Sequence, residues 1–86
     1  MDMEVIKEVE YIIGLMNTEH KQTFGRLENL LMWLKDNRKQ MNNFYIEHDY
    51  KTDKYIITSY GYEITEGNIF KNRHIVIDCL YELINI

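Results

Sequence analysis

The spacing of the apolar residues changes at about residue 43 of this chain of 86 residues. Before that point apolar residues recur every three or four positions, which is typical of helices that bury one face. From Phe44 they alternate with polar residues, which is typical of a strand with one buried face. The sequence therefore predicts an α+β fold. A chain of this length builds one modest core, so we expect residues 1–86 to form a single domain.

Two helical patterns come first, and we expect them to form an antiparallel pair. The first covers Asp2 to Met16, with Asp2 as its N-cap. The second covers Thr18 to Gln40 and contains Gly25. Two interpretations of Gly25 stay open. Either the helix is continuous and tolerates a glycine at a cost of about 1 kcal/mol, or Gly25 marks the turn between two shorter helices.

The alternating region predicts an antiparallel β-hairpin. One face of its first strand carries Phe44, Ile46, His48 and Tyr50, and the other carries Tyr45, Glu47 and Asp49. A polar turn at Lys51–Lys54 leads into a second strand from Tyr55 to about Ile64. After a turn at residues 65–68, Ile69 and Phe70 are candidates for a third strand, and a C-terminal helix is expected from about Asn72 to Ile84.

Composition limits where such a chain works. The only cysteine is Cys79, which excludes an intrachain disulfide and indicates a reducing compartment. The N-terminus is acidic where a secretory signal needs basic residues, and no apolar run is long enough to span a membrane. We therefore expect a cytoplasmic protein without a membrane partner. Ile, Asn, Lys, Tyr, Phe and Met make up about half of the chain, and alanine and proline are absent. This usage indicates an AT-rich genome, such as that of a phage or mobile element.

No catalytic or cofactor motif is present in the sequence. His20, His48 and His74 are too scattered to form a metal-ligand pair, and Cys79 is expected to be a buried small hydrophobe. Glu47 and Asp49 lie on one strand face, but no nucleophile or base accompanies them, so a solvated face is the simpler interpretation. We expect no enzyme, no cofactor and no metal.

The hairpin is rich in aromatic residues, and tyrosine is enriched at recognition surfaces because it joins a large rigid ring to a polar tip. With a net charge of −4, the chain is expected to be a small non-enzymatic binding protein. In size, charge and residue usage it resembles anti-CRISPR proteins and similar phage inhibitors of host defence. Its partner would be a protein, such as one with a basic nucleic-acid-binding surface, and a homodimer is compatible with the small core. The expected partner-binding residues are Tyr45, Glu47, Asp49, Tyr50, Asp53, Tyr60 and Tyr62.

A second interpretation is a winged helix-turn-helix regulator. Residues Tyr55–Ile64 resemble the end of a wing in bacterial regulators, where a strand runs into Tyr-x-Leu-Thr-x-x-Gly. If Gly25 is the turn, the segment from Arg26 to Gln40 is the recognition helix, and Lys51–Lys54 is the wing tip. DNA would be the partner only under the winged-helix interpretation. The resemblance then implies DNA contacts from Arg26, Asn29, Lys35, Arg38, Lys39, Lys51 and Lys54.

Overall fold

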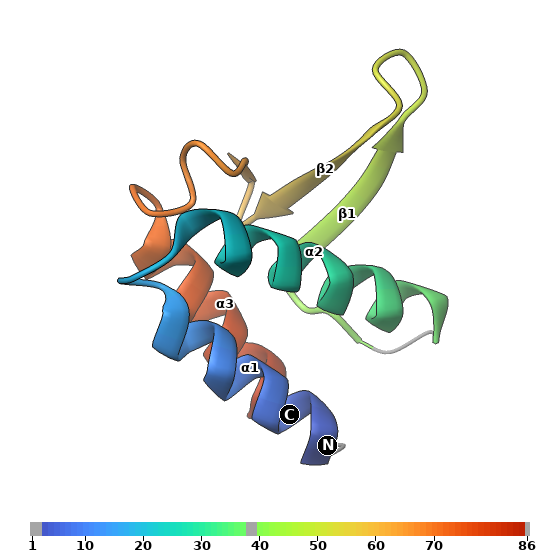
Figure 1. The fold of residues 1–86 in the computed structure, drawn as a ribbon. Helices are drawn as coiled ribbons and strands as arrows, with labels where there is room; N and C mark the ends of the chain where they lie inside the picture. The colour runs from blue at the N-terminus through green and yellow to red at the C-terminus, as the bar shows by residue number, and fades with distance from the viewer. Residues whose placement is uncertain (1–2, 38–39, 86) are drawn as a thin grey trace.

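The protein consists of two helices, a small sheet and a final helix. The computed structural model describes residues 3–37 and 40–85. Its elements are α1 (Met3–Leu15), α2 (His20–Asp36), β1 (Phe44–Asp49), β2 (Lys54–Ser59), β3 (Tyr62–Ile64) and α3 (Arg73–Ile84). The strands form one antiparallel sheet in the order β1-β2-β3, which lies on one side of the helices (Figure 1). The predicted α+β fold is confirmed.

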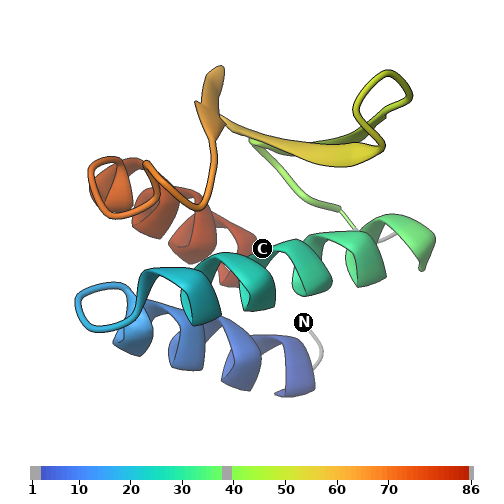
Figure 2. The same ribbon diagram turned by 45° about the horizontal axis from the view of Figure 1, so that its top comes forward.

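The helices α1 and α2 form the predicted antiparallel pair, joined by residues 16–19 (Figure 2). The side chain of Glu19 caps α2, because its Oε1 accepts hydrogen bonds from the backbone N–H groups of Lys21 and Gln22. The cap expected at Asp2 lies outside the described residues. The apolar stripes of the two helices face the core and include Val5, Val9, Ile12, Leu27, Leu31 and Leu34.

Helix α2 passes through Gly25 without a break, so the continuous interpretation of this glycine holds. A Cβ atom placed at Gly25 would meet no atom within 4 Å, which means that no close packing requires a glycine there. The bend that the winged-helix interpretation placed at Gly25 is therefore absent from α2. The turn between the two helices lies at residues 16–19 instead.

The pairing of β1 with β2 confirms the predicted hairpin and its two faces. Phe44 lies opposite Ser59, and Ile46 lies opposite Ile57. These side chains are buried against the helices, whereas Tyr45 is 59% exposed on the outer face. One face of the sheet thus closes the core, and the other is free of it.

The predicted second strand, Tyr55 to Ile64, is divided into two strands. Tyr60 and Gly61 form a two-residue turn between Ser59 and Tyr62, with φ of 49° and 81°. Positive φ at both positions is what a type I′ hairpin turn requires. The sequence did not reveal this turn, because asparagine or aspartate, and not tyrosine, is the usual residue at its first position.

The third strand is therefore β3, and the placement of a third strand at Ile69 and Phe70 is wrong. Both residues lie in the turns that precede α3. Ile69 is fully buried there, so the apolar residue that suggested a strand fills the core from a loop.

Helix α3 completes the core. It packs against α1 and β2, while α2 packs against β1. Ser59 in β2 donates a hydrogen bond from Oγ to Cys79 Sγ at 2.9 Å, and both residues are fully buried. The predicted burial of Cys79 is confirmed. Helix α1 begins and α3 ends at the same end of the helical layer (Figure 1).

Candidate protein-interaction surfaces

The outer face of the β1–β2 hairpin carries three of the predicted partner-binding residues. Tyr45, Glu47 and Asp49 alternate with the buried residues of β1 and point away from the helices. Tyr45 and Glu47 are exposed, and Asp49 is half-buried. A tyrosine beside two carboxylates offers a rigid apolar ring and negative charge on one face.

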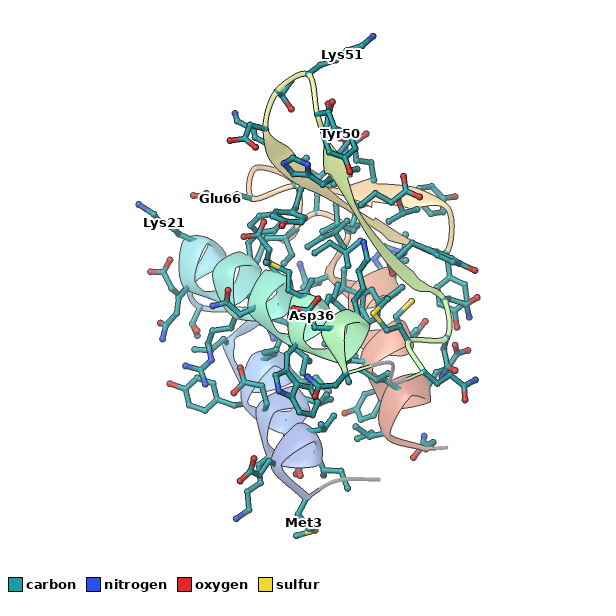
Figure 3. All side chains as sticks on the ribbon, turned by 90° about the vertical axis from the view of Figure 1, so that its right-hand side faces the viewer. Met3, Lys21, Asp36, Tyr50, Lys51 and Glu66 are labelled. Carbon is teal, nitrogen blue, oxygen red and sulfur yellow. The ribbon has the colours of Figure 1, made fainter. Side chains whose placement is uncertain are left out.

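The tip of the hairpin carries Tyr50 and Asp53, and it is held by side-chain hydrogen bonds. Asp49 Oδ1 accepts a hydrogen bond from the Lys51 N–H at 2.9 Å. This bond and a further one from the Thr52 hydroxyl lower the pKa of Asp49. Figure 3 shows Tyr50 and Lys51 at the far end of the hairpin from the helices.

Across the hairpin, His48 Nε2 lies 2.8 Å from Asp53 Oδ1. The His48 ring also contacts two tyrosines, with centroid distances of 4.7 Å to Tyr50 and 5.1 Å to Tyr55. Tyr50 itself is 88% exposed. The tip therefore presents an aromatic side chain on a preformed turn, which lowers the entropy lost when a partner binds.

Tyr60 lies at the opposite end of the sheet and has a structural role. Its hydroxyl donates to Glu82 Oε1 in α3, and Asn43 Nδ2 donates to Glu82 Oε2 at 2.8 Å. The hydrogen bond to the Glu82 carboxylate, together with partial burial, raises the pKa of Tyr60 to about 12. These contacts fasten the β2–β3 turn to α3, whereas Tyr62 on β3 is exposed. The seven predicted residues thus belong to the outer face, the tip and the distant β2–β3 end.

Two residues of the predicted DNA-binding set make contacts within the molecule. Arg26 forms a double hydrogen bond with Glu8 of α1, with Nε–Oε2 and Nη2–Oε1 distances of 3.0 and 2.6 Å. Its guanidinium also lies 4.2 Å from the centroid of the Tyr11 ring. Lys35 Nζ donates to the backbone oxygen of Ile46 at 3.2 Å. These two cations stabilise the fold.

The other members of that set are dispersed. Asn29 is exposed on α2, Lys51 lies in the hairpin turn, and Lys54 begins β2. Arg38 and Lys39 lie outside the described residues. The cations within the described part of the chain do not form one continuous basic face of the kind that phosphate binding needs.

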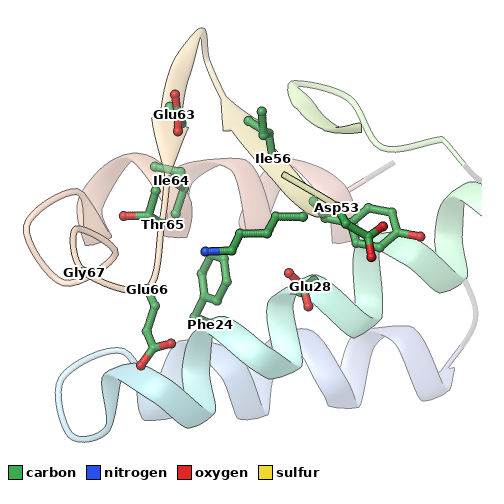
Figure 4. A pocket seen from close by; sticks show the side chains of 11 residues that line it. Phe24, Glu28, Asp53, Ile56, Glu63, Ile64, Thr65, Glu66 and Gly67 are labelled. Atoms are coloured by element: carbon green, nitrogen blue, oxygen red, sulfur yellow. The ribbon is translucent and has the colours of Figure 1, made fainter. Parts of the chain in front are cut away.

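A groove between α2 and β2 was not expected from the sequence. This α2–β2 groove has a volume of about 540 Å³ and is lined by Phe24, Glu28, Asp53, Lys54, Tyr55, Ile56, Glu63, Ile64, Thr65, Glu66 and Gly67. Figure 4 shows Phe24 and Glu28 extending from α2 into it. Four of the lining residues are carboxylic acids and one is a lysine. Because its residues come from three separate segments, no local pattern in the sequence predicts it.

A second groove, smaller and more apolar, lies between α1 and α2. It has a volume of about 230 Å³ and is lined by Glu4, Val5, Glu8, Asn29, Leu30 and Trp33. The Trp33 side chain is 42% exposed at its rim.

The described residues contain no cluster of three or more His, Cys, Asp or Glu side chains that could hold a metal ion. The side chain of His20 lies outside the described part of the structure. Burial raises the pKa of the Cys79 thiol, which disfavours the reactive thiolate. None of the described helices has the length and apolar character needed to cross a membrane.

Comparisons of the chain with protein-family models, with curated proteins and with solved structures find no match.

Proposed function

We propose that this chain is a non-enzymatic binding protein that acts by covering the surface of a partner protein. The observation that carries the proposal is the outer face and tip of the hairpin, where Tyr45 and Tyr50 are 59% and 88% exposed. Neither ring contributes to the core, and both are held on a preformed hairpin. Exposed rigid aromatic side chains of this kind are typical anchors of protein interfaces.

The partner has a basic surface, such as the nucleic-acid-binding groove of another protein. Glu47 and Asp49 lie beside Tyr45 on the outer face, and the chain carries a net charge of −4. Opposite charge steers two proteins together and penalises wrong partners. AT-rich residue usage and small size support a phage or mobile-element origin, with the protein acting as an inhibitor in the cytosol of the host.

The test compares single variants in an affinity purification from a low-GC bacterial host. Tyr45→Ser and Tyr50→Ser remove one exposed ring each, and Tyr81→Ser removes a ring with 49% exposure from α3 as the matched control. We expect one stoichiometric basic protein to be captured by the wild type and the control. The two hairpin variants should lower the measured affinity about fivefold to thirtyfold, as for an aromatic anchor worth about 1–2 kcal/mol.

The contribution of charge to binding is tested by comparing Glu47→Lys with Glu10→Lys. The control makes the same change of charge at an exposed residue of α1. Glu47→Lys should slow association most at low salt. If Tyr45→Ser, Tyr50→Ser and Glu47→Lys all bind the captured protein as the wild type does, the hairpin surface is not the binding site.

Binding to DNA as a winged-helix regulator is the second candidate, favoured by the position of Lys51 at the far end of the hairpin, where a wing tip contacts DNA (Figure 3). A gel shift with duplex DNA at about 50 and 200 mM salt tests it. Binding that falls steeply with salt and is weakened by Lys51→Gln would support this function. Absence of a shift at the lower salt concentration would exclude it.

A further inference from the structure

The α2–β2 groove contains an unpaired stretch of strand edge. Ile57 and Ser59 of β2 pair with β3, but β3 ends at Ile64, opposite Ile57. Tyr55 lies two residues before Ile57 and therefore faces the same edge. Among the described residues, no backbone hydrogen bond joins Tyr55 to the loop at residues 65–67. The N–H and C=O groups of Tyr55 thus point toward the groove without a strand beside them.

On the edges formed by β1 and β3, a side chain occupies one backbone carbonyl group of each strand. On β1, Lys35 Nζ donates to the Ile46 carbonyl oxygen at 3.2 Å. On β3, Asn68 Nδ2 donates to the Glu63 carbonyl oxygen at 3.0 Å. Side chains that occupy edge carbonyl groups discourage pairing with another strand. Among the described residues, no hydrogen bond of this kind to the backbone of Tyr55 is found.

The charge and shape of the α2–β2 groove define what fits beside Tyr55. Glu28, Asp53, Glu63 and Glu66 line it together with one cation, Lys54, so cationic side chains of an added strand meet an excess of carboxylates. The half-buried Phe24 ring supplies apolar contact (Figure 4). An acidic wall alone would suit any cation, but a free strand edge beside an apolar ring suits a peptide backbone.

We propose that the α2–β2 groove binds an extended, lysine- or arginine-containing segment of a partner protein, which pairs with the backbone of Tyr55 as a continuation of β3. The inference rests on the proposed function only in that the occupant belongs to a protein partner. The groove shares Asp53 with the tip of the hairpin, but Tyr45, Glu47 and Tyr50 do not line it.

The test uses a synthetic peptide that alternates arginine and leucine, its N-methylated version, and a version with glutamate in place of arginine. N-methylation keeps the charge but removes the N–H groups that pair with a strand edge. Titration into isotopically labelled protein should shift the amide signals of Tyr55, Phe24 and Glu66. The Tyr55 amide should also exchange with solvent at least tenfold more slowly. Neither the methylated nor the acidic peptide should have these effects.

Single variants show which carboxylates of the α2–β2 groove contribute to peptide binding. Glu28→Gln and Glu63→Gln should each lower the affinity for the arginine peptide about threefold, as expected for exposed ion pairs. Glu10→Gln on α1 is the matched control and should have no effect. Glu66→Lys reverses a charge in the lining of the groove and should lower the affinity for the peptide further. The far-ultraviolet circular dichroism of each variant is measured to check that it is folded.

Three results would overturn the proposal: equal binding of the methylated peptide, unchanged affinity in Glu28→Gln and Glu63→Gln, or protection of Tyr55 that rises with protein concentration without peptide. The last would show that a second copy of the chain fills the groove. Tyr45→Ser and Tyr50→Ser should bind the peptide normally, so failure of the hairpin surface and failure of the α2–β2 groove are distinguishable.

Discussion

Tyr60 combines a strained backbone with a side chain that ties two elements together. A bulky residue at φ of 49° costs about 1–2 kcal/mol, and glycine or asparagine would normally occupy such a position. The hydroxyl group provides the compensation, because it donates to Glu82 at the end of α3. A residue that looks like part of a binding surface in the sequence is thus an anchor within the molecule.

The raised pKa of Tyr60 predicts how this anchor responds to alkaline pH. Its folded-state pKa of about 12 lies above the ordinary value of 10.0, so the neutral phenol is favoured by folding. This contribution is fully present below pH 10.0 and is lost as the pH rises toward 12. Wild type should be more stable than Tyr60→Phe at neutral pH, and the difference should shrink toward pH 12 in urea unfolding experiments. A difference that stays constant over this range would contradict the assignment.

Two glycines should respond to alanine in opposite directions. Gly25→Ala should raise the free energy of unfolding by about 1 kcal/mol, because the position is helical and a Cβ atom there meets nothing within 4 Å. Gly61→Ala should lower it by about 1–2 kcal/mol, because φ is 81°. Thermal or urea unfolding of both variants measures this. A loss of stability in Gly25→Ala would mean that α2 is not continuous there.

At the scale of the elements, most of the secondary structure could be predicted because it follows from local periodicity. Val5, Val9 and Ile12 recur at a spacing that only a helix places on one face. The alternation around Ile46 is a spacing that only a strand places on one face. The division between β2 and β3 could not be predicted, since Tyr60 is an unusual residue for its turn. Ile69 was predicted as a strand residue because a buried position in a loop requires an apolar residue just as a buried position in a sheet does.

The candidate surfaces were predictable only where one element carries them. Alternation along β1 was enough to place Tyr45 and Glu47 together on the outer face. It gave no information on whether Tyr50 and Tyr60 share a surface, because that depends on which ends of the sheet their turns occupy. Similarly, the contact of Arg26 with Glu8 joins two helices, so a cation counted as available for DNA is bound within the fold.

At the scale of the whole molecule, the small core makes Cys79 a reporter of global opening. The thiol is fully buried and accepts a hydrogen bond from Ser59, and its pKa is raised by burial. We expect an aromatic disulfide reagent to modify the native protein only through its small population of open molecules, and the urea-unfolded protein at once. Destabilising the fold with Gly61→Ala should accelerate modification in proportion to the population of the open state. Rapid modification of the native wild type would show that the thiol is accessible.

Because α1 begins and α3 ends at the same end of the helical layer, the chain is suited to circular permutation (Figure 1). A short flexible linker between these two ends, with new termini opened in the connection at residues 16–19, would keep every helix and strand intact. In such a permuted chain, α2 and the hairpin are made first, and α1 is made last. The same proximity allows both ends to be attached to a support while the tip of the hairpin stays free to meet a partner.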